Sequence, residues 1–504
     1  MKTNPIGYSL VKNSLWNFLF TLISRAGGIL FIALISRALL PENFGIYNLA
    51  LSIAMIFFSF ADLGINKVAM TYISEALSKN YENKAKSHFN YLIKLKLVIS
   101  FIVSFVLLIV AYPISYIIFN QQMLFIPLIL FSVYIFILSI SSFFEALFFT
   151  IGNVKDINTK ELIYQIARII LVFLTFLFLT YNYYLYGVII SLILSLMIIL
   201  TFLILKLRRR EPRLFGKRNY IEKNKKNLLK FMFYVTIGSI SGLFFGYVDT
   251  AILGFFTPPS YIGFYSAGFA IIGSLVGFFS FSNIFLPAFS KTSRKNSFVL
   301  FNKIFRYTMI LTIPSATGIV FLSRYVIYFL YGSDYLQAVV PLCILSILLI
   351  EIPFSNLLSS LLLSRKKAKQ NSKFLATSAI INVILNIILA SILVKISFQL
   401  ILVGIASSTI FSRVVYSLLL VRYSKKDLNL KIPFYHLVKP VIASIIMVLA
   451  LTFINYSISS MSLLIGVVEI IVGILVYFLV LFFLREIKKE DIQLLNQIKH
   501  STSF

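Results

Sequence analysis

The chain is poor in the residues that build disulfide bonds and metal centres. It contains a single cysteine, Cys343, which excludes an intramolecular disulfide and a cluster of cysteine ligands. Its three histidines, His88, His436 and His500, stand far apart, so a zinc site is not expected. The nucleotide-binding pattern G-x-x-x-x-G-K-[ST] is absent as well. We therefore expect neither a metal nor another cofactor.

Charge is also scarce. Charged residues make up 12% of the 504 residues and hydrophobic residues 59%, with a mean hydropathy of +0.94. A soluble fold of this composition could not cover its own surface, so the chain is expected to be an all-α polytopic membrane protein. The net charge of +29 does not indicate nucleic-acid binding. Excess Lys and Arg in membrane proteins mark cytoplasmic loops, and the aromatic residues here lie within apolar runs instead of alternating with arginine.

Long apolar runs are abundant. A transmembrane helix needs about 20 apolar residues to cross ~30 Å of hydrocarbon. Lys2 and Lys12 precede the first run without a small-residue cleavage site, so we expect an uncleaved first helix. The sequence predicts fourteen spans, at 14–39, 44–73, 97–119, 123–150, 158–180, 184–207, 231–256, 262–289, 307–329, 335–363, 372–395, 398–421, 436–457 and 461–484.

The basic residues alternate between the two sides of these spans. With the N-terminus inside, the cytoplasmic segments and their flanks hold 39 of the 46 Lys and Arg residues. Cytoplasmic loops of membrane proteins carry such an excess. We therefore predict a multi-pass protein of the cell membrane with both termini in the cytoplasm.

Two stretches of the sequence are similar to each other. "NFGIYNLALSI" at 43–53 follows Pro41, and "YIGFYSAGFAI" at 261–271 follows Pro259. Six spans separate the copies, an even number, so they share one orientation and form a parallel repeat. The predicted organisation is a six-helix lobe at 1–207, a basic linker at 208–230, a second six-helix lobe at 231–421, an appended helix pair at 422–484 and a cytoplasmic tail at 485–504.

Apart from charged residues toward their ends, the predicted spans contain nine Asp, Glu, Lys and Arg residues. An ion in the membrane costs about 2.5–3.5 kcal/mol even on the lenient insertion scale, so such residues line cavities or pair with each other. Snorkelling to the interface is the alternative for Lys67, Glu145 and Arg413, and local pairing is the alternative for Glu469. The remaining members of the set are Arg25, Asp62, Arg168, Asp249 and Glu351.

Arg25 and Asp249 each lie on a stripe of small or polar residues along one face of a helix. The stripes are Asn17, Thr21, Arg25 and Gly28 in the first span, and Ser239, Gly242, Gly246 and Asp249 in the seventh. Small residues alone would favour close helix packing. A charge within the stripe favours a water-filled cavity, and the repeat makes these two spans the equivalent first helices of the lobes.

Several segments resemble a known family. They are "SRALLPENFGIYNLALSIAMIFFSFADLGINKVAMTYISE" at 36–75, "YVDTAILGFFTPPSYIGFYSAGFAI" at 247–271, "YFLYGSDYLQAVVPL" at 328–342, and the pair Asn382 and Asn386 in "INVILNIIL", followed by "VGIASS". Together they resemble the polysaccharide-export flippases of the multidrug/oligosaccharidyl-lipid/polysaccharide superfamily. The likeness extends from the first span to the twelfth.

The resemblance implies a flippase, not an enzyme. Its substrate would be a polyprenyl- or dolichyl-diphosphate-linked oligosaccharide, moved from the cytoplasmic to the outer leaflet by alternating access of two lobes arranged in a V. Arg25 matches the arginine often found in the family's first helix, and Asp249 the acid of its D-x-x-x-L-G segment. Arg168 and Glu351 are added because of their depth in the membrane, and Asn17 and Asp62 complete the set of candidate cavity residues. The implied partners are the bilayer, glycan-assembly enzymes and a coupling ion, H+ or Na+.

Two other functions remain open. A multidrug or cation antiporter of the same fold should have a net acidic or aromatic cavity, whereas the charges within the spans nearly balance. A membrane glycosyltransferase or polymerase should carry acidic residues in sizeable outer loops. The predicted outer loops are short, and their acids are Glu42 and Asp334. The flippase is the favoured interpretation.

Overall fold

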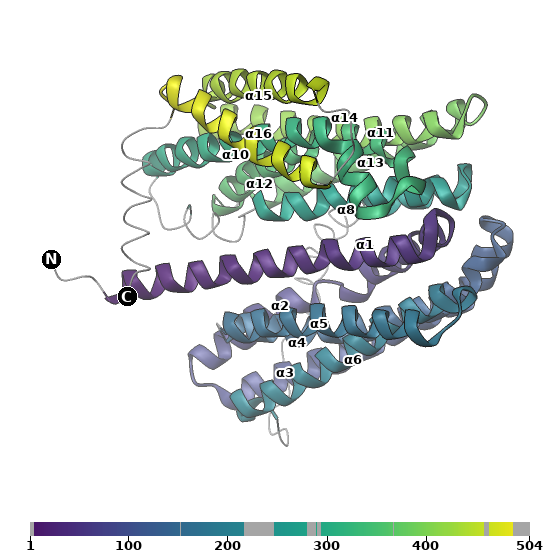
Figure 1. Cartoon of the computed structure of the whole chain (residues 1–504). Coiled ribbons are helices and arrows are strands. Elements are labelled where there is room, and N and C mark those ends of the chain that lie inside the picture. Colours follow the sequence, from purple (N-terminus) through teal and green to yellow (C-terminus); the bar gives the residue numbers. More distant parts are fainter. Residues whose placement is uncertain are drawn as a thin grey trace. The chain divides into compact units, whose positions relative to one another are not determined.

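The structure is a computed structural model that describes residues 5–151, 153–215, 246–279, 289, 294–365, 367–457 and 463–486. Regular structure in these residues is helical throughout (Figure 1). The helices are α1 (Pro5–Asp62), α2 (Ile65–Ser78), α3 (Glu82–Pro113), α4 (Phe125–Thr150), α5 (Val154–Phe178), α6 (Tyr184–Arg210), α8 (Pro259–Phe279), α10 (Arg294–Tyr331), α11 (Val339–Leu345), α12 (Leu348–Ser364), α13 (Ala368–Leu393), α14 (Phe398–Leu428), α15 (Val438–Ser457) and α16 (Leu463–Phe483).

The described helices confirm an all-helical, multi-pass membrane protein. Twelve candidate spans are long and apolar enough to cross a membrane, and a shorter apolar helix covers Gly246–Phe256. The first candidate, Ile23–Ser78, has 56 residues, more than twice the length that one crossing requires. The seventh predicted span, 231–256, lies mostly outside the described residues. The count of fourteen spans therefore stays a prediction.

A sharp bend in α1 separates the first two predicted spans. Leu40 leaves the helical region, with φ 60° and ψ 168°, directly before Pro41. The proline ring disfavours the α conformation of the preceding residue, and a positive φ is strained for a residue with a branched side chain. The sequence thus ends one crossing at Leu40 and starts the next at a proline, the residue best tolerated in a first helical turn.

The chain divides into two compact units. One unit consists of Leu30–Ala267 and Leu375–Thr409, and the other of Met1–Ile29, Gly268–Phe374 and Ile410–Phe504. In the first unit, α4 packs against both α3 and α6, and α5 packs against α6. In the second, α10 packs against α12, α15 and α16. The lobe boundaries that the repeat suggests remain a prediction.

Within the second unit, a hydrogen bond at a proline break in α10 connects this helix to the appended helix α16. Pro314 lies inside α10 and has no N–H, so the carbonyl of Ile310, four residues earlier, loses its helical hydrogen bond. The hydroxyl of Tyr477 in α16 donates to this carbonyl at 2.7 Å. A buried carbonyl in hydrocarbon needs such a donor. The break in α10 thereby becomes an attachment point for α16.

Within the first unit, the two similar sequence stretches contact each other reciprocally. A Cβ atom added at Gly45 would lie 1.8 Å from the carbonyl oxygen of Pro259, and one added at Gly263 would lie 2.2 Å from that of Pro41. Each glycine follows its own proline by four residues, one helical turn. The same short motif therefore forms both sides of a close backbone contact, as expected of a repeat.

We predict that Gly45→Ala lowers the thermal stability of the purified protein, because the new methyl group overlaps a backbone oxygen that cannot rotate away. Overpacking of this kind costs about 1–3 kcal/mol. Gly273→Ala is the matched control, since an added Cβ there has no neighbour within 4 Å. It makes the same change of helix propensity without the overlap. Equal melting temperatures for the two variants would show that the contact does not form.

Candidate functional site

Asp249 is the centre of a buried polar cluster in the first unit. It lies on the helix Gly246–Phe256, and its side chain has no exposed surface. Three side chains donate hydrogen bonds to its carboxylate. Tyr265 and Thr409 donate to Oδ2 at 2.9 and 2.7 Å, and Asn386 donates to Oδ1 at 2.6 Å. The donors come from three different helices, α8, α14 and α13, so tertiary packing assembles the cluster.

A second layer of polar groups surrounds the first. Asn382 and Asn386 lie one turn apart on α13 and therefore share a face. The side-chain amide of Asn382 donates to the Thr409 hydroxyl at 3.3 Å, and the Ser408 hydroxyl donates to the side-chain carbonyl oxygen of Asn386. Gly404 allows α14 to approach α13, because a Cβ there would lie 2.7 Å from a methyl carbon of Leu393.

The carboxylate of Asp249 has no basic partner among the described residues. No Lys or Arg of the described residues forms an ion pair with Asp249. An ionised carboxylate shut away from water is costly unless a cation or a proton neutralises it. The carboxylate, amide and hydroxyl oxygens within the cluster are ligands that hard cations prefer. The arrangement can therefore hold a small cation or a proton.

The sequence identified only part of this cluster. Asp249 was expected to face a water-filled cavity, but in this conformation its own hydrogen-bond partners enclose it. Ser239 and Gly242, from the same predicted stripe, lie outside the described residues. Asn382 and Asn386 appeared in the family resemblance without a role, and their i, i+4 spacing in an apolar run was the available signal. Tyr265, Ser408 and Thr409 were missed, because such residues are common in membrane helices.

Arg25 lies on α1 within the second unit and is exposed. Its guanidinium group lies over Gly277 of α8, where an added Cβ would come within 2.5 Å of the Arg25 Cζ and Nε atoms. It forms no ion pair or hydrogen bond with any described residue. Asn17 and Thr21, from the same predicted stripe, belong to a part of α1 whose side chains lie outside the described set. Arg25 is thus a cation in a membrane span that no described acid neutralises.

Arg168 lies on α5 within the first unit. Its guanidinium stacks on the rings of Phe31 and Tyr164, with Cζ 4.3 and 5.1 Å from their centroids, and donates to Gln165. Its Nε is buried, with neither a hydrogen-bond partner nor a paired acid among the described residues. Aromatic faces attract a cation but leave its charge uncompensated. Arg168 therefore keeps donor capacity for a further acceptor.

The other two candidate acids form ion pairs with lysine or arginine. Asp62 pairs with the fully buried Lys96 at 2.9 Å. Glu351 of α12 accepts from the Nε of Arg413 at 2.8 Å and from the hydroxyl of Ser417 at 2.7 Å. Removing one member of a buried pair leaves a charge without compensation. These contacts favour a structural role for Asp62 and Glu351.

The structure also describes the surroundings of Arg413, Glu145 and Glu469. Arg413 and Glu145 do not simply snorkel, because Arg413 pairs with Glu351 and Glu145 pairs with Lys160 at 3.1 Å. The described residues do not support local pairing, the alternative considered for Glu469. Its side chain is fully buried, and neither carboxylate oxygen has a hydrogen-bond partner among the described residues.

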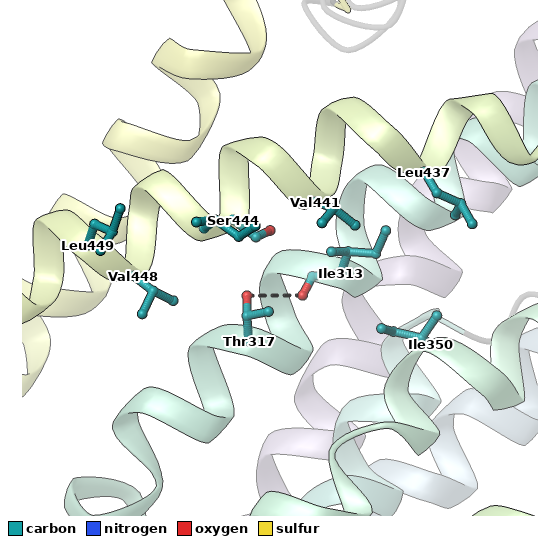
Figure 2. A pocket seen from close by; sticks show the side chains of 9 residues that line it. Ile313, Thr317, Ile350, Leu437, Val441, Ser444, Val448 and Leu449 are labelled. Atoms are coloured by element: carbon teal, nitrogen blue, oxygen red, sulfur yellow. Dashed lines mark hydrogen bonds between the residues drawn. The ribbon is translucent and has the colours of Figure 1, made fainter.

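An apolar cavity lies between α10, α12 and α15 in the second unit (Figure 2). Its volume is about 480 Å³. Leucine, isoleucine and valine side chains form most of the wall, and the hydroxyl of Thr317 is already bonded to the carbonyl of Ile313 at 3.2 Å. The hydroxyl of Ser444, which also lines the cavity, has no hydrogen-bond partner among the described residues. A wall that is otherwise made of aliphatic side chains suits hydrocarbon better than a sugar.

An all-helical multi-pass chain with uncompensated charges in its spans has the features of a membrane transport protein. Residues 10–293, more than half of the chain, match the sequence profile of the polysaccharide biosynthesis protein family. The chain therefore belongs to that family, in agreement with the resemblance stated from its motifs.

Two curated proteins are similar to the chain. An uncharacterized membrane protein of Methanocaldococcus jannaschii is 24% identical over 392 residues, which cover 74% of this chain and 77% of the relative. The probable low-salt glycan biosynthesis flippase Agl15 of Haloferax volcanii is 25% identical over 233 residues, 45% of this chain and 47% of the relative. The match with Agl15 thus spans about half of that protein.

Solved structures share the fold. The lipid II flippase MurJ in an inward closed conformation superposes with a TM-score of 0.74 at 20% identity, covering 93% of this chain and 98% of MurJ. An inward-facing multidrug resistance MATE family transporter of the MOP superfamily gives 0.63 at 12% identity, covering 81% and 99%. The chain has the fold of this superfamily. Agl15 and MurJ are named as flippases and the MATE family protein as a transporter, in agreement with the expectation that the chain is not an enzyme.

Proposed function

We propose that the protein is a flippase that moves a lipid-diphosphate-linked oligosaccharide from the cytoplasmic to the outer leaflet by alternating access. The observation that carries this proposal is the pair of arginines in membrane spans, Arg25 and Arg168, that no described acid neutralises. A third arginine within a membrane span, Arg413, is by contrast paired with Glu351. Guanidinium groups at membrane depth that no described acid neutralises suit an anionic substrate.

The chemistry of the substrate explains why arginine is used. A diphosphate that crosses the bilayer needs fixed cations in place of water, and the planar guanidinium fork binds two phosphate oxygens at once. Membership of the polysaccharide biosynthesis family and the flippase named among its relatives support a lipid-linked glycan as the cargo. The apolar cavity beside α15 suits the hydrocarbon chain of such a lipid.

The Asp249 cluster is our proposed site for the coupling ion, Na+ or H+. Its carboxylate has three hydrogen-bond donors but no basic partner among the described residues, so binding of one positive charge neutralises it. A conformational equilibrium shifts only by the difference in a ligand's affinity for the two states. If one conformation of the protein binds the ion more tightly at this cluster, the ion shifts the conformational equilibrium toward that conformation.

The remaining elements of the proposal follow from the sequence. We place the protein in the cell membrane with both termini in the cytoplasm, and the six-helix lobes at 1–207 and 231–421 move against each other. Glycan-assembly enzymes would supply the lipid-linked sugar inside and use it outside. A cation antiporter is the second candidate, because the buried Asp249 cluster and the MATE-like fold also suit an organic cation exchanged for an ion.

Reconstitution in vesicles tests these functions directly. The purified protein is combined with a fluorescent polyprenyl-diphosphate-linked sugar, and a membrane-impermeant glycosidase reports the sugar in the outer leaflet. We expect rapid exposure of the diphosphate-linked sugar and slower exposure of a neutral glycolipid with the same sugar. Equal rates for both lipids, or rates equal to those of protein-free vesicles, would contradict the proposal. Uptake of an organic cation without any sugar exposure would favour the antiporter.

A further inference from the structure

Glu469 occupies an unusual position in α16. It follows the first residue of this helix by six positions, about 9 Å along the axis at 1.5 Å per residue, so it lies within the apolar part of the span. Its side chain has no exposed surface, and both carboxylate oxygens lack hydrogen-bond partners in the part of the chain that the structure describes. The other described acids of the spans have a basic partner or several donors.

A cavity of about 380 Å³ adjoins Glu469 in the second unit. Helices α10, α15 and α16 form most of its wall, and the wall is apolar except for Ser315, Tyr477 and Glu469. Neither hydroxyl donates a hydrogen bond to the carboxylate. Ser315 donates to the carbonyl of Leu311 at 2.7 Å, and Tyr477 donates to the carbonyl of Ile310 at 2.7 Å. The volume is enough for several water molecules, each of which occupies about 30 Å³ in the liquid.

The other titratable and charged groups near Glu469 do not neutralise it. On α10 these are Arg324, which is exposed and forms no described ion pair with it, and Tyr325, whose hydroxyl donates to Asn455 at 3.0 Å. On α16 the nearest is Tyr477. The charged residue of α15, Lys439, pairs with Glu486 near the opposite end of the helix, and α8 contributes only Leu275 to the cavity.

We propose that Glu469 is a proton-binding site, which holds a proton in the present conformation and exchanges it with water when the cavity opens. A metal ion would need several oxygen ligands, whereas the other side-chain oxygens of the cavity wall are the hydroxyls of Ser315 and Tyr477, which already bond to backbone carbonyls. An organic cation would need access to a group that is fully covered. A proton needs neither, and it removes the charge that burial disfavours. This site is independent of which substrate the protein carries.

The wall of the cavity has features that allow it to open. Pro314 interrupts the hydrogen bonding of α10 beside the cavity, and Gly318, one turn further, has no atom within 4 Å of the position of an added Cβ. A helix whose ladder is broken at a proline and loosely packed after it can bend at low cost. Such a movement would bring water to Glu469.

Carbodiimide labelling tests the proposal, because dicyclohexylcarbodiimide is apolar and reacts with the neutral form of a carboxylic acid. The full-length protein is labelled in lipid vesicles at a series of pH values, and the modified peptides are identified by mass spectrometry. We expect Glu469 to be labelled at acidic pH and the rate to fall by about tenfold per pH unit once the proton is lost. Glu351, paired with Arg413, is an internal control that should stay unlabelled.

The variant Glu469→Gln should lose this label and still insert into the membrane, because glutamine resembles the neutral acid in size and charge. Absence of label on Glu469 at every pH, with its peptide detected, would overturn the proposal. A labelling rate that does not change with pH would overturn it as well, since the proton would then not exchange. Both results come from the wild-type protein and hold even if the variant fails to fold.

Discussion

Replacing Arg25 with alanine is expected to lower glycan export about 10- to 100-fold per molecule of inserted protein. Arg25 lies eleven residues into the first predicted span, about 16 Å along the helix at 1.5 Å per residue, and thus near the middle of the bilayer. A hydrogen bond to a charged group contributes about 1.5–3 kcal/mol, which corresponds to this range in rate. No described acid holds Arg25, so its removal breaks no ion pair among the described residues.

Two related variants separate charge from geometry. Arg25→Lys keeps the charge but loses the bidentate hydrogen bonding to phosphate, so partial export should remain. Gly277→Ala places a methyl group 2.5 Å from the present position of the Arg25 Cζ, which forces the guanidinium to move without changing its charge. It should reduce export less than Arg25→Ala does.

Arg413→Ala is the matched control for Arg25. It also removes an arginine from a membrane span, but one that is paired with Glu351. Breaking a buried pair leaves the carboxylate uncompensated. Arg413→Ala should therefore lower the amount of inserted protein, whereas the molecules that do insert keep their export rate. If Arg25→Ala behaved in the same way, Arg25 would be a structural residue and the diphosphate contact would be refuted.

Asp249→Asn is expected to abolish the dependence of export on the coupling ion, and to reduce export strongly while the protein still inserts. Asparagine fits the same space and still accepts hydrogen bonds, but it lacks the negative charge that retains a cation or a proton. A ligand that binds the folded state raises its stability in proportion to the logarithm of its concentration. Melting temperatures of purified protein therefore report binding without a transport assay.

The melting experiment also distinguishes the two ions. If Na+ binds, added NaCl should stabilise the wild-type protein more than KCl does, and Asp249→Asn should remove the difference. If H+ binds, acidification should stabilise the wild-type protein relative to the variant. Asp62→Asn is the control, because it alters a membrane acid paired with Lys96 outside the cluster and should keep the ion response. A wild type indifferent to both ions would remove Asp249 from the coupling mechanism.

Part of the candidate site could be found without coordinates. An ionisable residue in an apolar run is visible in the sequence, because the cost of its insertion depends mainly on the residue and its depth. Arg25, Arg168 and Asp249 were selected in this way. Asp62 and Glu351 were selected by the same rule, although their ion pairs with Lys96 and Arg413 favour a structural role. The rule detects the charge but not its partner.

The partners depend on contacts between helices that are distant in the sequence. Thr409, which donates to Asp249, lies 160 residues away from it, and Arg413 lies 62 residues from Glu351. No periodicity within one helix carries information over such separations. For the same reason the sequence could offer only a local partner as the alternative for Glu469, while no described residue bonds to either of its carboxylate oxygens.

Composition and hydrophobic run length by themselves determined that this is an all-helical, multi-pass membrane protein, because hydrocarbon imposes the same requirement on every span. The motifs determined its family, because they combine glycine, proline and polar residues in a fixed order. Only the tertiary structure decided which membrane charges are neutralised. Neutralisation requires two groups within a few ångströms of each other, and packing of the helices sets that distance.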